Sequence, residues 1–243
     1  MIGVDDGVTM GPMYQSRLFS PDEIEYEPLQ VIARDGFVTY DPYFLEPGFA
    51  DEFFESLLPG VAWKQDVIRL YGRTIPVPRL TAWYGDNDAS YTYSGIRNEP
   101  SEWISPLQEL RDRLEKSTTI RFNSVLLNRY RTGKDSLSWH ADDEPELGMR
   151  PTIASISLGA TRTFQLQHRV SGEVIALSLE HGSLLLMSGE TQQLWKHQVP
   201  KDRSVTGERI NLTFRSIDAA RVRQGSSRAT SRSRHERPSA SRR

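Results

Sequence analysis

Two segments in the first half of the chain carry apolar residues at the spacing of an amphipathic helix. The first spans residues 46 to 60, "EPGFADEFFESLLPG", and a Pro-Gly pair ends it. The second spans residues 105 to 117, "SPLQELRDRLEKS", with Ser105 as the expected N-cap and Pro106 at the first helical position. The apolar positions are Phe49, Phe53, Phe54, Leu57 and Leu58 in the first segment and Leu107, Leu110 and Leu114 in the second. We predict two supporting helices.

From about residue 120 the pattern changes to short β-like runs separated by Gly, Asp, Ser and Pro. The runs are "RFNSVLLNRY", "TIASISLG", "RTFQLQH", "EVIALSL", "GSLLLMSG" and "RINLTFRS". Strands of this length and spacing are typical of a β-sandwich or jelly roll, and the sequence contains no internal repeat. The pattern therefore predicts an α+β fold with a jelly-roll core and supporting helices.

The last run separates into an apolar and a polar face. Ile210, Leu212 and Phe214 alternate with Arg209, Asn211, Thr213 and Arg215. A solvent-exposed sheet face would explain the polar positions equally well. If they point into a closed sandwich instead, the two arginines need buried anions, and a bound dicarboxylate would pair with both. Asn128 and Tyr130, which share a face of another predicted strand, could add two neutral hydrogen bonds to it.

The amino-acid composition excludes several kinds of site and of cellular location. The chain has no cysteine, which excludes disulfides, thiolate zinc sites and cysteine nucleophiles and suits a reducing cytoplasm. The N-terminal "MIGVDDGVTM" is acidic where a secretory signal needs positive charge, and no run of roughly 18 apolar residues occurs. We therefore expect a soluble intracellular protein without a membrane partner, cytoplasmic, or nuclear in a eukaryote.

Charge divides the chain into an acidic body and a basic end. Residues 221 to 243 hold eight arginines and one glutamate, which leaves residues 1 to 220 with a net charge of −9. Such an Arg/Ser-rich segment buries too little apolar surface to order itself, so we expect a disordered tail over 218–243. This tail is either a phosphate-binding arm or a solvated terminus.

The stretch "SLSWHADDEPELG", residues 136 to 148, places one histidine among four carboxylates. On an extended segment His140 and Asp142 point the same way and can share a metal, although a solvated acidic loop would explain the pattern as well. A third ligand has to come from a distant strand, and His197, just before the last run, is the best candidate. The remaining histidines are His168 at a strand end, His181 in a turn and His235 in the tail. Two histidines and one carboxylate form the ligand set of non-haem Fe(II) oxygenases.

These segments resemble the AlkB family of Fe(II)/2-oxoglutarate-dependent nucleic-acid dealkylases. The resemblance is carried by "LLNRYRTGKDSLSWHADDEPELG", "PTIASISLGATRTFQL", "HGSLLLMSG", "WKHQVP" and "RINLTFR", which occur in the family's order between about residues 70 and 217. With "VPRLTAWYGD" and "YTYSG", they look most like the branch that contains human AlkB homologue 2, which repairs duplex DNA. The resemblance implies a double-stranded β-helix with an N-terminal nucleotide-recognition lid.

The resemblance also implies the site residues. It assigns iron to His140, Asp142 and His197, and it makes 2-oxoglutarate and O2 co-substrates. The residues implied for 2-oxoglutarate are Asn128, Tyr130, Arg209, Thr213 and Arg215, to which the polar face of the last strand adds Asn211. His181 is not a ligand in this comparison. The expected domains are an extension over 1–30, a dioxygenase domain over 31–217 and the tail.

The substrate contacts follow from the same resemblance. A flipped base would lie between Tyr93 and His140, with Asp143 and Glu144 at its polar edge. The expected contact residues are Leu70, Tyr71, Gly72, Arg73, Arg79, Tyr91, Thr92, Tyr93, Ser94, Asp143 and Glu144. Leu70 to Gly72 match the wedge that enters the duplex. Tyr93 replaces the relative's phenylalanine, and Tyr71 is bulkier and more polar than its counterpart.

The expected function is oxidative demethylation of N-alkylated bases in DNA, with 1-methyladenine, 3-methylcytosine and etheno adducts as substrates. Formaldehyde, succinate and CO2 are the expected products, and we expect a monomer. One alternative is a dioxygenase of the same fold that acts on RNA or another non-DNA substrate. Another is a non-enzymatic nucleic-acid-binding protein that uses the basic tail, which would leave the metal triad unexplained.

Overall fold

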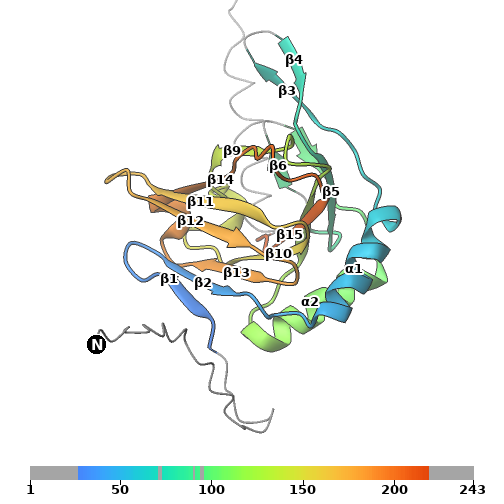
Figure 1. Ribbon diagram of the computed structural model, residues 1–243, viewed down its shortest axis with the longest axis horizontal. Coiled ribbons are helices and arrows are strands. Elements are labelled where there is room, and N and C mark those ends of the chain that lie inside the picture. The colour runs from blue at the N-terminus through green and yellow to red at the C-terminus, as the bar shows by residue number, and fades with distance from the viewer. Residues whose placement is uncertain (1–26, 71–72, 90, 94–95, 219–243) are drawn as a thin grey trace, which may run out of the picture.

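The computed structural model describes residues 27–70, 73–89, 91–93 and 96–218, and for residues 68–70, 73, 91–93 and 96–98 it describes the backbone alone (Figure 1). Several sequence-based predictions therefore lie outside the described part of the chain. They are the order of the N-terminal extension and of the arginine-rich tail, the positions of Tyr71, Gly72 and Ser94, and the side-chain contacts of Leu70, Arg73, Tyr91, Thr92 and Tyr93.

Within the described residues, two antiparallel sheets face each other (Figure 1). The major sheet has the order β1 (Leu29–Ile32), β2 (Phe37–Asp41), β13 (Leu184–Ser188), β10 (Ile153–Gly159), β15 (Arg209–Arg215), β8 (Ser124–Tyr130) and β5 (Leu80–Gly85). The minor sheet has the order β12 (Val174–Leu179), β11 (Arg162–His168), β14 (Trp195–Val199) and β9 (Leu137–His140). From β8 to β15 the chain passes repeatedly between the sheets, four strands to each, which is the topology of a double-stranded β-helix. The predicted jelly-roll core is confirmed.

Two short hairpins accompany the sandwich. Strands β3 (Val67–Leu70) and β4 (Arg73–Pro76) form one, and β6 (Tyr91–Tyr93) and β7 (Ile96–Asn98) form the other. In Figure 1 the β3–β4 hairpin projects beyond the sandwich at the end where β9, β14 and β6 lie.

Helices α1 (Pro47–Gly60) and α2 (Ser105–Thr118) cover the outer face of the major sheet (Figure 1). One apolar cluster joins them to the sheet, with Phe53, Leu57, Leu107, Leu110 and Leu114 from the helices and Ile210, Leu212 and Phe214 from β15. Each such side chain stabilises the fold by about 1.5–3 kcal/mol when fully buried. Because the apolar face of β15 meets the helices, its polar face must point between the sheets.

Two details differ from the sequence-based predictions. Helix α2 begins at Ser105 itself, its N-cap residue is Ile104, and no side chain caps it, so the prediction of Ser105 as the N-cap was wrong. Strands β1, β2 and β5 precede residue 120 and extend the major sheet, although the pattern of apolar and polar residues indicated strands only after that point. Strand β5 is buried along almost its whole length and therefore lacks the alternation that identifies a half-buried strand.

The smaller elements are the single helical turns η1 (Pro145–Leu147) and α3 (Thr191–Leu194). In the part of the chain that the structure describes, every helix is too short or too polar to cross a membrane.

Candidate active site

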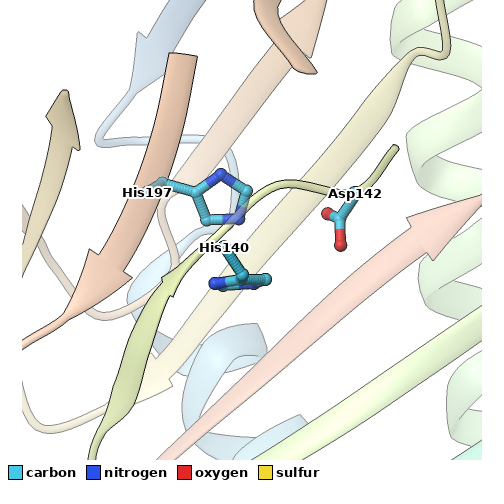
Figure 2. Close-up of side chains that lie close together, drawn as sticks. All are labelled: His140, Asp142 and His197. Carbon is cyan, nitrogen blue, oxygen red and sulfur yellow. The ribbon is translucent and has the colours of Figure 1, made fainter. Parts of the chain in front are cut away.

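The three predicted metal ligands lie together on neighbouring elements. His140 ends β9 and pairs in register with His197 of β14, so the two imidazoles leave adjacent strands on the same side. Asp142 follows two residues after β9. The ligand atoms of the three residues all lie within 4.8 Å of one another, and Figure 2 shows their side chains close together. The described residues thus bring the predicted triad together.

The electrostatics of the triad suit a divalent metal. Burial, together with the nearby His140, lowers the pKa of His197 to about 3, and burial also lowers the pKa of His140. Both imidazoles are therefore neutral at physiological pH, as metal ligation requires. Burial raises the pKa of Asp142, but effects that lower it outweigh burial, the largest being the positive charge of Arg215, so this pKa lies below its ordinary value. Two neutral nitrogens and one anionic oxygen match the Fe(II) facial triad.

The polar face of β15 lies between the sheets, which is one of the two arrangements that its alternation allowed. Arg209 is 1% exposed, and its Nη2 donates a hydrogen bond to Ser157 Oγ at 2.9 Å. Its Nε and Nη1 and the hydroxyl of Tyr130 have no hydrogen-bond partner among the described residues. Burial lowers the pKa of Arg209 to about 10, so the side chain remains a cation at neutral pH. A buried cation with unsatisfied donors requires an anion, and a carboxylate of 2-oxoglutarate fits this requirement.

A cavity of about 140 Å³ connects the triad with this face. The polar residues in its wall are Lys64, Asp66, Arg79, Thr81, Asn128, His140, Asp142, Glu144, Ser155, His197, Asn211, Thr213 and Arg215. The apolar residues are Ala82, Trp83, Leu126, Leu137, Ala141, Phe164, Met187 and Val199. Tyr130 and Arg209 are paired in register two residues beyond the pair of Asn128 and Asn211, and neither is among the residues that line the cavity.

The structure describes three of the expected substrate-contact side chains. Glu144 and Arg79 line the cavity. The Nε of Arg79 donates a hydrogen bond to Asn128 Oδ1 at 2.6 Å, so this arginine also orients a residue of the implied 2-oxoglutarate set. Asp143 lies outside the cavity wall and forms an ion pair with Arg169 at 3.2 Å. The substrate roles of these residues stay predictions.

Several residues of the site carry no signal in the sequence. Lys64 and Asp66 line the cavity, and Asp66 accepts a hydrogen bond from Thr81 at 2.6 Å. Phe164 stacks on the ring of His197 with 5.3 Å between the ring centroids. Gln192 accepts a hydrogen bond from the backbone N–H of Asp142 at 2.9 Å. These contacts join segments far apart in the chain, so no local pattern could indicate them.

The other described histidines have structural contacts. Nδ1 of His168 lies 2.9 Å from Ser171 Oγ, and its ring packs against Trp195. His181 accepts a hydrogen bond from the backbone N–H of Gly159 and lies 3.3 Å from Asp51. Neither belongs to the metal cluster, in agreement with the sequence-based interpretation.

The double-stranded β-helix and the His-Asp-His cluster together define an Fe(II)- and 2-oxoglutarate-dependent oxygenase. The chain belongs to the 2OG-Fe(II) oxygenase superfamily, whose family model matches residues 37–215, and within it to the AlkB family, close to the two groups of relatives described next. This assignment confirms the resemblance and the expected cofactors, Fe(II) with 2-oxoglutarate.

The relatives carry two names. The alpha-ketoglutarate-dependent dioxygenase alkB homolog 3 of Mus musculus is 45% identical over 188 residues, which is 71% of this chain and 65% of the mouse protein. The DNA oxidative demethylase ALKBH2 of Homo sapiens is 40% identical over 179 residues, 69% of each chain. The chain thus spans about two thirds of the length of these relatives. The solved structure of OsALKBH1 has the same fold, with a TM-score of 0.53 and 18% identity over 74% of this chain and 97% of that one.

Proposed function

We propose that the protein is an oxidative demethylase that repairs N-alkylated bases in DNA by direct reversal. The proposed substrates are 1-methyladenine, 3-methylcytosine and etheno adducts. For a methylated base the proposed products are the unmodified base, formaldehyde, succinate and CO2. The observation that carries this proposal is that the metal triad and the buried polar face of β15 both contribute residues to the wall of the same cavity. The relatives named DNA oxidative demethylase ALKBH2 support DNA as the substrate.

Residues in and next to the cavity would have separate roles. His140 and His197 would hold Fe(II) as neutral donors and Asp142 as an anion, while Arg215 keeps that carboxylate ionised. Arg209 and Tyr130 would bind one carboxylate of 2-oxoglutarate. With both bound, the centre supplies the oxidation of an N-alkyl C–H bond by O2, coupled to decarboxylation of 2-oxoglutarate.

Other residues of the cavity wall would control access to the N-alkyl carbon of the substrate. Leu126, Leu137 and Phe164 are apolar residues of the cavity wall and would limit the access of bulk water to a bound metal. A flipped base would enter past Glu144, whose carboxylate can accept a hydrogen bond from an exocyclic amino group. After hydroxylation, the N–C bond breaks, the base nitrogen keeps the electron pair, the hydroxyl proton is released to water and the carbon leaves as formaldehyde.

A succinate-release assay tests the proposal. The purified protein, Fe(II) and 2-oxoglutarate are incubated with single-stranded DNA, duplex DNA or RNA, each with and without 1-methyladenine or 3-methylcytosine. We expect release with methylated DNA and none with the Asp142→Ala variant. Release with methylated RNA alone would replace the proposal with an RNA demethylase, and tight nucleic-acid binding without turnover would favour a binding protein.

A repair role would place the protein with the genome, in the cytoplasm of a bacterium or the nucleus of a eukaryote. One chain supplies the complete triad, so we propose that it acts as a monomer. Size-exclusion chromatography of the active protein with light scattering would test this.

A further inference from the structure

The three metal ligands are not held in place by the same means. His140 and His197 belong to paired strands, so the β9–β14 ladder fixes their backbones. Asp142 lies after the end of β9, in a segment without regular secondary structure, and is 3% exposed. Its buried backbone N–H therefore requires an acceptor from outside the ladder.

Gln192 supplies that acceptor. Its Oε1 accepts the Asp142 N–H at 2.9 Å, and Gln192 is itself only 1% exposed. The Nε2 of the same side chain lies 3.6 Å from Sδ of Met187 on β13. The amide group of Gln192 therefore lies between the segment that carries Asp142 and the floor of the major sheet.

The turn that carries Gln192 is itself anchored. The neighbouring Thr191 is 1% exposed, its Oγ1 accepts the N–H of Phe37 at 3.0 Å and it donates to the carbonyl of Ser188 at 2.5 Å. Helix α3 is thus attached to β2 and to the end of β13. This anchorage fixes the position of the Gln192 carbonyl independently of any metal.

We propose that Gln192 is a positioning residue for the metal site, which holds the backbone of Asp142 so that its carboxylate stays beside the two histidines. Arg215 draws the same carboxylate toward β15, with 2.5 Å between Arg215 Nη2 and Asp142 Oδ1. Two opposed contacts, one on the backbone and one on the side chain, therefore define where Asp142 lies. Partners that orient metal ligands typically contribute about 10–100-fold to metal affinity.

The test measures metal binding by the protein without nucleic acid, so its outcome does not depend on the proposed substrate. Isothermal titration with Mn(II) under anaerobic conditions compares the wild type with Gln192→Met, which keeps the side-chain length and removes the acceptor. We expect Mn(II) binding to weaken by about 10–100-fold. Gln192→Glu keeps an acceptor oxygen and should bind Mn(II) at least ten times more tightly than Gln192→Met.

Gln193 offers a matched control, because it is the adjacent glutamine, is exposed and donates to the carbonyl of Met149 instead. Gln193→Met should bind Mn(II) like the wild type. Equal affinity in Gln192→Met and Gln193→Met would overturn the proposal.

Hydrogen exchange of the metal-free protein provides a second readout. The amide of Asp142 should exchange faster in Gln192→Met while the amides of β14 keep their protection. If Gln192→Met does not fold, Gln192→Asn, whose carbonyl is one methylene short, replaces it in both measurements. Unchanged exchange at Asp142 in the folded variant would contradict the assigned role.

Discussion

Arg215 and Asp142 form an ion pair inside the sandwich, with 2.5 Å between Nη2 and Oδ1 and side chains that are 5% and 4% exposed. Arg215 lies at the end of β15 and Asp142 in the segment after β9, so the pair joins the two sheets beside the metal ligands. Replacing only one residue of such a buried ion pair destabilises the protein strongly, because the other charge stays buried without its partner in the pair.

Breaking this pair should reveal strong coupling in the metal-free protein. Arg215→Met and Asp142→Asn are each expected to lower the free energy of unfolding, Arg215→Met by about 3–5 kcal/mol because it leaves a buried anion. The double variant should lose clearly less than the sum of the two, since it removes both charges. Urea denaturation of the four proteins measures this. Additivity within about 0.5 kcal/mol would show that the pair is not coupled.

The two single variants and the double variant form a double-mutant cycle with the wild type. The exposed pair of Arg113 and Glu109 on α2 is the control for this cycle. Its side chains are 40% and 54% exposed, at 3.0 Å. Surface pairs at this helical spacing are worth about 0.3–0.5 kcal/mol. The same cycle on α2 should therefore give a coupling energy several times smaller.

Arg209 and Arg162 should respond differently to substitution, although both guanidinium carbons lie over the ring of Tyr130, at 5.3 Å and 5.4 Å from its centroid. Arg162 donates to the carbonyls of Asp135 and Pro200 at 2.9 Å and 2.7 Å. Arg162→Met leaves these acceptors without that donor and should destabilise the protein by about 1–3 kcal/mol or more. Arg209→Met removes a cation whose proposed anionic partner is the co-substrate, so it should destabilise the ligand-free protein less.

Arg209→Met and Arg162→Met should also differ in the 2-oxoglutarate concentration that they require. Losing a buried charged partner costs about 3–5 kcal/mol, so Arg209→Met should raise the 2-oxoglutarate concentration for half-maximal succinate release by at least about 100-fold. Soluble Arg162→Met protein should need nearly the wild-type concentration. A normal requirement in Arg209→Met would show that another group binds the carboxylate.

Asp135 should make stability depend on pH. It accepts hydrogen bonds from the backbone N–H of Arg131 at 3.0 Å and from its guanidinium at 2.7 Å and 2.9 Å. Burial raises the pKa of Asp135, but these hydrogen bonds outweigh burial and hold the pKa below its ordinary value. The ionised carboxylate therefore stabilises the fold above the unfolded pKa of about 3.9, and this contribution disappears as the pH falls through the lower folded value.

Asp135→Asn tests this pH dependence. Its free energy of unfolding should lie below that of the wild type at pH ~7, and the difference should shrink as the pH falls below about 4. Denaturation by urea across this range measures the difference. Asp112→Asn changes a side chain that is 67% exposed, so it should alter the free energy of unfolding little at either end of the pH range. A constant difference for Asp135→Asn over the whole range would contradict the prediction.

The basic tail should act on nucleic-acid binding and not on chemistry. Residues 221 to 243 carry eight arginines, while the preceding chain has a net charge of −9. Each phosphate contact to single-stranded DNA adds about 0.7 to the slope of log affinity against log salt. Deleting 221–243 should weaken DNA binding at low salt and flatten this slope, with turnover at saturating substrate unchanged. An unchanged slope would mean that the segment makes no phosphate contacts.

The sequence was most informative where a local pattern determines geometry. The alternation along 209–215 predicted which side chains share a face, because side chains alternate on every strand, but it left open whether the polar face is solvent-exposed or lies between the sheets. The helices decide this, because they cover the apolar face. The spacing of His140 and Asp142 predicted a shared metal for a similar reason. His197 was placed by its position before the last strand, and the strand pairing explains why this was correct.

Other features depend on contacts that the local pattern does not contain. The start of α2 was misplaced by one residue, since a leucine stripe fixes the face of a helix more firmly than its end. Neither Asp66 nor Gln192 could be assigned to the site from the sequence, because each is held there by a hydrogen bond to a residue of another segment. Strand β5 was missed because its neighbours bury both of its faces.

The register of His140 against His197 makes the metal site sensitive to how the minor sheet assembles. Strand β14 alternates half-buried Lys196 and Gln198 with buried His197, and Lys196 lies over the ring of Trp139, 5.5 Å from its centroid. If β14 paired with β9 one residue out of step, every side chain on it would change face, and a cation or an amide would replace the imidazole. Such a misfolded sheet could not capture iron. Metal binding would therefore select the correctly paired molecules from any that assemble out of step.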